Sequence, residues 1–410
     1  MTHSSGLAEY RAALTTAGAR GPVLAAMLGR LPIAMVGFSL LLYVQRVSGS
    51  FAQAGVVSAS VLIGVALGSI VQARRMDRVG PSRPLMVAST IFAGCVTATV
   101  VAIEHGAPIV ALIPLALSIG ISQPTIGAAS RAMWTRLLPP GSTRNAALTY
   151  EAIITEVYFI VGPALSGLLL TAPWPGTGVI VGAGLMVVGT VWYAFTPTMR
   201  GFRPSAGPVA TRTLLGALAS PGLRTVAVAS LGMGVILGFI EVTVPAAASK
   251  TGHVAAGGLL LGLWSVSSAL FGIFYGIRPW PRTVRLRIPA LLGGFALLVL
   301  PLMLADSLLA LGLILLIAGT LITPQTAAHA ESVEGVALNG LITESFGWVI
   351  TAATLGIGLG HAVSGQVIER AGVGAGYLTA AFVGATLAFV VFLRRNTLVD
   401  RDHAANPIPV

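Results

Sequence analysis

The sequence contains very little charge for its length. Only 9% of its 410 residues are Asp, Glu, Lys or Arg, and 55% are hydrophobic, whereas a soluble domain carries about 25% charged residues. So small a supply cannot cover the surface of a water-soluble globule. The composition therefore predicts a membrane protein, whose backbone must satisfy its own hydrogen bonds as helices or as a closed barrel.

Cysteine and the common catalytic motifs are equally scarce. Cys95 is the single cysteine, so an intramolecular disulfide is impossible. The six histidines are scattered, and no HExxH, paired-cysteine, Gly-x-Ser-x-Gly or Walker-type motif occurs. We therefore expect no metal, no cofactor, no enzymatic activity and no use of ATP.

The sequence is rich in long apolar runs instead. They extend over about 20 residues without the alternation typical of barrel strands, and they predict an all-α integral membrane protein with twelve transmembrane helices. The expected spans are 23–45, 52–73, 84–103, 108–130, 146–170, 177–196, 225–248, 255–277, 288–305, 308–328, 338–365 and 373–393.

The basic residues predict the orientation of these spans. With the N-terminus inside, 21 of the 24 Lys and Arg residues fall in cytoplasmic segments, and such an excess marks the cytoplasmic side. Both termini are therefore expected in the cytoplasm. The ratio of 23 Arg to one Lys, with abundant Ala and Gly, indicates a GC-rich bacterial genome, so the expected location is the bacterial inner membrane. Because the net charge of +11 lies in short loops, we expect a lipid bilayer and no nucleic acid as partner.

Short matches at a nearly constant offset indicate that the two halves are related. The matched pairs are the segments 162–167 and 360–365 (offset 198), Pro124 and Pro324 (offset 200), and Gly37 and Gly238, each followed by Phe (offset 201).

This repeat predicts two pseudo-symmetric six-helix bundles. Their expected bounds are residues 1–197 and 225–410, the second with a short cytoplasmic tail. The stretch 198–224 is rich in Arg and Pro and is expected to be a cytoplasmic linker.

The loop between the second and third spans carries the most specific motif. Residues 73–83 read Ala-Arg-Arg-Met-Asp-Arg-Val-Gly-Pro-Ser-Arg, which resembles the loop motif Gly-x-x-x-Asp-Arg-x-Gly of the major facilitator superfamily, with Ala73 in place of the first glycine. The resemblance implies two six-helix halves around a central cavity. It also implies a cytoplasmic latch formed by Asp77, Arg78, Gly80, Arg83, Arg131 and Arg136.

In this latch Asp77 would pair with Arg131 or Arg136 at the inner end of the fourth span. The alternative is that the arginines of the loop only determine topology. A second motif, Gly162-Pro163 followed by Gly167, resembles the Gly-Pro motif of proton-coupled drug exporters and favours efflux. Its alternative role is close helix packing.

Four glutamates lie inside the expected spans and are candidates for proton coupling: Glu151, Glu156, Glu241 and Glu344. A charge in the bilayer costs at least about 2.5 kcal/mol, so each should face protein or a water-filled cavity. Glu151 and Glu156 are separated by about 140° around one helix, so they cannot share a site. One of them is therefore a candidate for a structural ion pair with Arg30 or Arg131.

Six further residues are weaker candidates for lining a substrate cavity: Arg30, Tyr43, Gln123, Trp264, Trp348 and His361. Arg30 has the alternative of extending to the inner membrane surface. His361, which replaces the proline of the repeat, has the alternative of a packing role.

These features favour a monomeric secondary transporter that exports a small lipophilic or amphiphilic compound in exchange for protons, by alternating access. One alternative is a proton-coupled symporter that imports a sugar or another nutrient. An alternative of another class is a non-transporting receptor or an intramembrane enzyme.

Overall fold

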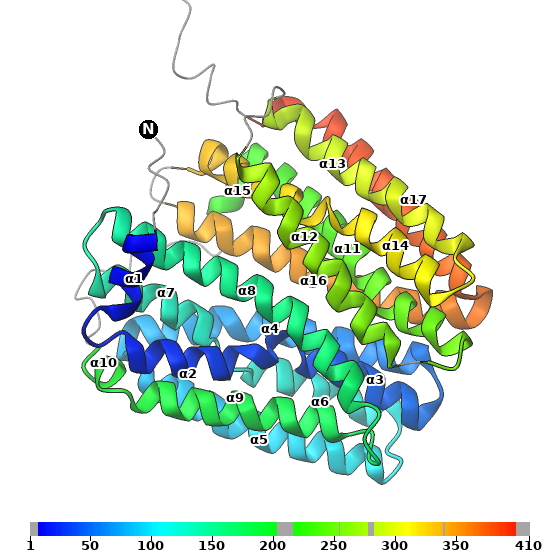
Figure 1. The fold of residues 1–410 in the computed structure, drawn as a ribbon, viewed down its shortest axis with the longest axis horizontal. Helices are drawn as coiled ribbons and strands as arrows, with labels where there is room; N and C mark the ends of the chain where they lie inside the picture. The colour runs from blue at the N-terminus through cyan, green and yellow to red at the C-terminus, as the bar shows by residue number, and fades with distance from the viewer. Residues whose placement is uncertain (1–6, 203–215, 254, 278–282, 339–340, 399–410) are drawn as a thin grey trace, which may run out of the picture. The chain divides into compact units, whose positions relative to one another are not determined.

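A computed structural model describes residues 7–202, 216–253, 255–277, 283–338 and 341–398, except for the side chains of Leu7, Asp77, Gly276, Ile277, Ile342 and Thr343. All regular secondary structure in this part of the chain is helical (Figure 1). Twelve of the described helical segments are long and apolar enough to cross a membrane. The prediction of an all-α membrane protein with twelve spans is therefore confirmed.

The contacts divide the chain into two compact units. Unit 1 comprises Met1–Val47 and Ile63–Gly207, and unit 2 comprises Ser48–Leu62 and Pro208–Val410. Helix α4 (Phe51–Val79) is shared, because its first part belongs to unit 2 and the remainder to unit 1.

The other helices of unit 1 are α1 (Leu7–Thr15), α2 (Arg20–Arg30), η1 (Leu31–Ala34), α3 (Val36–Ser48), α5 (Ser82–Glu104), α6 (Ile109–Ser122), α7 (Ile126–Leu137), α8 (Ser142–Leu169), α9 (Thr177–Phe195) and α10 (Pro197–Arg200). Those of unit 2 are η2 (Ala217–Ala219), α11 (Pro221–Lys250), α12 (Ala256–Ile277), α13 (Val284–Val299), η3 (Leu300–Leu304), α14 (Leu308–Gly319), α15 (Ile322–Val336), α16 (Ile342–Ala371), α17 (Val373–Leu393) and η4 (Arg395–Thr397).

Helices reach both ends of the expected linker, residues 198–224. Helix α10 continues to Arg200, and α11 begins at Pro221. Proline suits the first turn of a helix, and the Ser220 hydroxyl caps α11 by accepting a hydrogen bond from the Leu223 amide (3.3 Å). Residues 203–215 of the expected linker lie outside the described residues.

The fourth span is broken in two, and a buried glutamine stabilises the break. Helix α6 ends at Ser122 and α7 begins at Ile126, on either side of Pro124. The side-chain amide of Gln72 on α4 donates to the carbonyls of Ile121 (3.1 Å) and Gln123 (2.9 Å). These bonds satisfy backbone groups that no water can reach in a bilayer.

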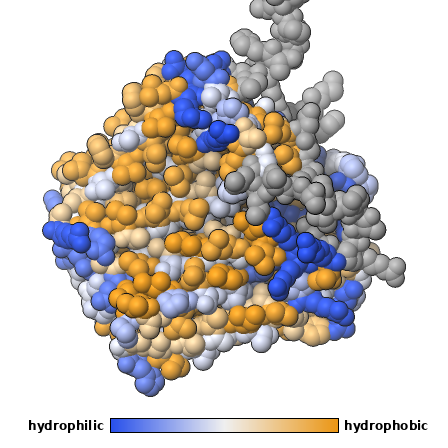
Figure 2. Space-filling view, turned by 180° about the vertical axis from the view of Figure 1, so that it is seen from behind, coloured by the Kyte–Doolittle hydropathy of each residue, from blue (hydrophilic) through white to orange (hydrophobic). Residues whose placement is uncertain are grey.

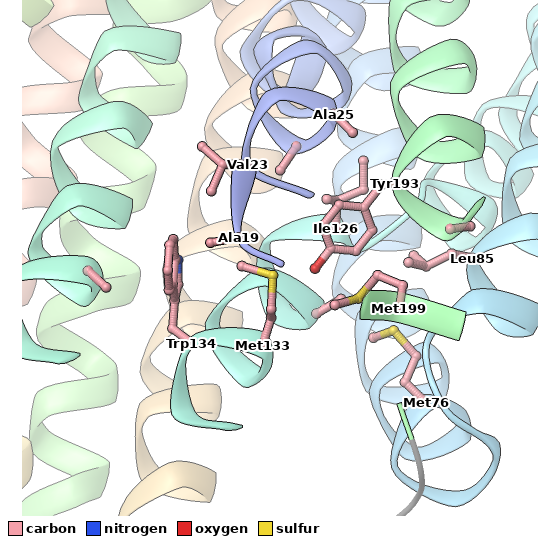
Figure 3. Close-up of a cluster of buried hydrophobic side chains, with 14 of the residues drawn as sticks. Ala19, Val23, Ala25, Met76, Leu85, Ile126, Met133, Trp134, Tyr193 and Met199 are labelled. Carbon is pink, nitrogen blue, oxygen red and sulfur yellow. The ribbon is translucent and has the colours of Figure 1, made fainter. Parts of the chain in front are cut away.

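Unit 1 has an apolar core at the end of the bundle where the chain begins (Figure 3). Figure 3 shows Met133 and Trp134 of α7 close to Ala19, with Tyr193 of α9 nearby. Ala13 of α1 belongs to the same buried cluster. Helix α1, which hydropathy did not predict, therefore forms because its apolar side packs on this core.

The outer surface of the described residues is apolar. Val110, Leu309 and Phe382 are more than 70% exposed, and Figure 2 shows hydrophobic residues over much of one face. Such large exposed apolar areas are typical of a surface covered by lipid.

Candidate functional site

The first candidate site is a buried ion pair in unit 1. Arg30, the last residue of α2, pairs through Nη1 with Oε2 of Glu151 on α8. Both side chains are at most 5% exposed. An ion pair so deeply buried is favourable only when its remaining polar atoms also have partners.

Those partners come from α7 and α8. The other carboxylate oxygen of Glu151 accepts hydrogen bonds from the Ser130 hydroxyl (2.6 Å) and from the Trp134 indole nitrogen (3.0 Å). Nη2 of Arg30 donates to the Thr155 hydroxyl (2.9 Å). Both carboxylate oxygens of Glu151 and both terminal nitrogens of Arg30 therefore have polar partners. The counter-charge of Glu151 is Arg30 rather than Arg131.

The second candidate site is in unit 2. Nε2 of His361 on α16 lies 2.7 Å from Oε2 of Glu241 on α11. Nδ1 of the same ring lies 2.9 Å from the hydroxyl of Ser58, in the part of α4 that belongs to unit 2. A neutral imidazole donates from one nitrogen and accepts at the other, whereas a protonated ring donates from both. Protonation of His361 would therefore change the direction of one hydrogen bond.

This second site is more open than the first. The side chain of Glu241 is 28% exposed, against 4% for Glu151. The Glu241 carboxylate is thus partly uncovered by the described residues, whereas Glu151 is enclosed by its partners. The sequence singled out Glu241 and His361 separately, but the pairing and the role of Ser58 were missed.

A second polar contact joins the same two helices, α4 and α16. The carboxylate of Glu369 accepts hydrogen bonds from the Ser50 hydroxyl (2.5 Å) and from the Ala52 amide (2.9 Å). In the same region, a Cβ atom on Gly55 would lie 2.2 Å from the carbonyl oxygen of His361. The start of α4 is therefore tied closely to α16 around the His361 ring.

The other two glutamates occupy different environments. Glu156 on α8 is half-buried, and its side chain forms no hydrogen bond with another described residue. Glu344 lies in the first turn of α16, where its carboxylate accepts from the amide of Ala217 (3.1 Å). Glu344 thus holds the start of η2, and a carboxylate in the first helical turn is favourable.

The weaker cavity candidates are mostly enclosed. Trp264 is buried and stacks on Phe295, with ring centroids 6.4 Å apart. Gln123 is buried at the break between α6 and α7, and half-buried Trp348 packs on an apolar cluster of unit 2. Tyr43 is fully buried on α3.

Tyr43 contacts Glu104, a residue that was not among the predicted site residues. Its hydroxyl donates to the carboxylate of Glu104, which also accepts from the Trp174 indole (2.7 Å). The rings of Tyr43 and Trp174 meet edge to face at 5.9 Å. Glu104 ends α5, just outside the apolar window, so no hydropathy signal could identify it.

The Gly-Pro motif lies at a close contact between α8 and the first span. A Cβ atom on Gly162 would lie 3.0 Å from that of Ala34. Ser166, one turn after Gly162, accepts a hydrogen bond from the Ser39 hydroxyl (2.8 Å). Pro163 and Gly167 are buried in the same helix, so this segment is closely packed.

The predicted latch residues Arg78, Gly80 and Arg83 lie at the turn between α4 and α5, whereas Arg131 and Arg136 lie on α7. Gly80 has φ +81°, which favours glycine, and Arg78, Arg83, Arg131 and Arg136 are exposed. Asp77 lies on α4, but its side chain is outside the described part of the structure. No group of three or more metal-ligating side chains occurs among the described residues.

A family model for the Major Facilitator Superfamily matches residues 23–346. The chain belongs to this superfamily. A sequence search among characterised proteins found no match. Because members of the superfamily are transporters, this facilitator is a multi-pass membrane transporter of small molecules and not an enzyme.

Solved structures share its fold at low sequence identity. A mutant of the nucleoside transporter NupG has 16% identity and a TM-score of 0.74, with 91% of this chain and 99% of that chain covered. A bacterial homologue of the human lysosomal transporter Spinster, inward-facing and occupied, has 14% identity and a TM-score of 0.68, with 92% and 97% covered. A POT family transporter bound to a thioalcohol-conjugated peptide has 14% identity and a TM-score of 0.66, with 91% and 95% covered.

Proposed function

We propose that this facilitator couples the export of a small lipophilic or amphiphilic compound to proton entry, by alternating access. The observation that carries the proposal is the pair formed by His361 and Glu241, 2.7 Å apart on membrane-spanning helices and partly open at the carboxylate. An imidazole and a carboxylate can each bind and release a proton, so this pair has the chemistry of a proton carrier.

The remaining predicted features belong to the same proposal. The chain would act as a monomer in the bacterial inner membrane with both termini cytoplasmic, and Asp77 would latch its cytoplasmic face with Arg131 or Arg136. Two bundles, residues 1–197 and 225–410, would move about the linker. Glu156 remains a second proton-binding candidate, since it is half-buried on α8.

Efflux of an apolar compound rests on weaker support. The Gly162-Pro163 segment is similar to that of proton-coupled drug exporters, and only 9% of all residues are charged. The alternative is proton-coupled import of a more polar solute. Structural neighbours named for a nucleoside and for a bound peptide show that polar solutes are also bound by proteins of this fold.

The test begins with a thermal-shift screen of the purified protein against drugs, sugars, nucleosides and lipids. The strongest hit is then used to drive proton flux in liposomes that enclose a pH-sensitive dye. We expect Glu241→Gln to lower coupled proton flux at least about tenfold, because the amide cannot carry a proton. Glu331→Gln is the matched control, since Glu331 pairs with Arg287 and is 44% exposed.

Two results would decide against the proposal. Unchanged coupling in all four variants, Glu151→Gln, Glu156→Gln, Glu241→Gln and Glu344→Gln, would show that none of the candidate glutamates carries the proton. Substrate that enters the liposomes together with protons, rather than against them, would establish the symporter instead.

A further inference from the structure

A groove at one end of unit 1 takes no part in the proposed proton path. It has a volume of about 640 Å³ and lies between the end of α4, the start of α5, the end of α9 and α10. The turn at Gly80 brings these segments together, since a Cβ atom on this glycine would lie 3.0 Å from the carbonyl oxygen of Phe202. The groove is therefore built by close backbone packing.

One part of the groove is suited to an anion. Arg83 and Arg200 line it and are exposed, and neither forms an ion pair with a described carboxylate. Helix α5 begins here without a side-chain cap, so the backbone N–H groups of its first two residues, Ser82 and Arg83, have no partner within the helix. The buried hydroxyl oxygen of Ser82 also lines the groove and has no hydrogen-bond partner in the described part of the chain.

The other part of the groove is apolar and open. Val79, Val87 and Phe195 line it and are each at least 50% exposed. The guanidinium of Arg200 lies 4.6 Å from the centre of the Phe195 ring, so the cationic and apolar parts are continuous. A ligand that fits both parts has a negative head and a hydrocarbon tail.

We propose that this groove binds an anionic phospholipid. Its phosphate would lie between Arg83, Arg200 and the Ser82 hydroxyl, and its acyl chain along Val79, Val87 and Phe195. Arginine forms charge-assisted hydrogen bonds to phosphate, and arginines next to a membrane attract anionic lipids. Charge complementarity selects this lipid class over zwitterionic lipids, since two cations line the groove and no described acidic side chain does.

Native mass spectrometry of the purified protein tests this proposal. Detergent-solubilised protein is titrated with phosphatidylglycerol, with phosphatidylcholine and with inorganic phosphate, and retained molecules are counted. We expect one tightly retained phosphatidylglycerol. Its affinity should fall about 30-fold in Arg83→Gln/Arg200→Gln, because each juxtamembrane arginine contributes about fivefold.

Matched variants separate a specific site from general attraction to a basic protein. Arg11→Gln/Arg20→Gln removes the same charge from exposed positions outside the groove and should retain the lipid. Val87→Trp fills the apolar part and should also release it. The proposal is overturned if the groove variants retain the lipid, if the control pair loses it equally, or if phosphatidylcholine or inorganic phosphate binds as tightly.

Discussion

The two units differ in where they place ionisable groups on corresponding helices. At the repeat offsets of 201 and 198, Arg30 and Glu151 of unit 1 correspond to Leu231 and Val349 of unit 2. Unit 2 therefore packs apolar side chains where unit 1 holds its buried ion pair. The bundle does not require a charge at this position.

The reverse holds further along the same helices. Glu241 and His361 of unit 2 correspond to Leu40 and Pro163 of unit 1. Each unit thus has a carboxylate that pairs with an arginine or a histidine and so joins the first span to the fifth span of that unit. The two pairs lie at different positions along these spans. The two polar pairs therefore do not occupy matched positions of the predicted repeat, and such local departures from a shared pattern are expected at functional sites.

The largest expected effect comes from breaking the buried pair of unit 1. Arg30→Leu should lower the free energy of unfolding by about 3–5 kcal/mol, because it leaves the Glu151 carboxylate without its counter-charge. Thermal or denaturant unfolding in detergent micelles measures this change.

The double variant Arg30→Leu/Glu151→Val copies the residues of unit 2 into unit 1. It should be markedly more stable than Arg30→Leu, since no unpaired charge remains. A double variant as unstable as the single one would show that the two units cannot exchange these residues, and that the pair is part of the fold of unit 1.

A smaller change in the free energy of unfolding is expected when a glycine in the first span of each unit is replaced by alanine. A Cβ atom on Gly238 of α11 would lie 2.2 Å from the carbonyl oxygen of Ile357 on α16, whereas the matched Gly37 has nothing within 4 Å. Gly238→Ala should therefore cost about 1–3 kcal/mol through overpacking. Gly37→Ala should be neutral or stabilising by up to about 1 kcal/mol.

The same unfolding measurement checks both alanine variants. If both variants change the free energy of unfolding equally, Gly238 is not packed more closely against α16 than Gly37 is against its own surroundings. Expression in the membrane fraction is a useful second measurement, because overpacked helices fail to assemble.

The spans could be predicted well because hydropathy is averaged over about 20 residues, so a single polar residue within a span changes the average little. The repeat was also visible, since Pro124 and Pro324 recur at a fixed offset. The pairing of side chains was not predictable in the same way. The choice of Arg30 rather than Arg131 for Glu151 depends on how α2, α7 and α8 are rotated, which one sequence does not encode locally.

Other features were missed because hydropathy gives no signal for them. Helix α1 has only nine residues, which is too short for a hydropathy window of about 20 residues, and its Ala13 packs in the core of unit 1. Glu104 lies at the end of its helix, and Ser58 is a small polar residue of a kind common in membrane helices. Nothing in their local sequence indicates that Glu104 meets Tyr43 or that Ser58 meets His361.

The smallest expected effect is the loss of stability in Glu241→Gln, which is compared with that in Glu151→Gln. Glu241→Gln should lower the free energy of unfolding by less than about 1 kcal/mol, because the group is 28% exposed and the amide can still bond to the ring. Glu151→Gln should cost several times more, because it leaves Arg30 charged and 5% exposed. Unfolding of both variants in the same detergent compares them directly. If Glu241→Gln proves as costly as Glu151→Gln, the pair in unit 2 is a structural one, and proton coupling must be sought at Glu156.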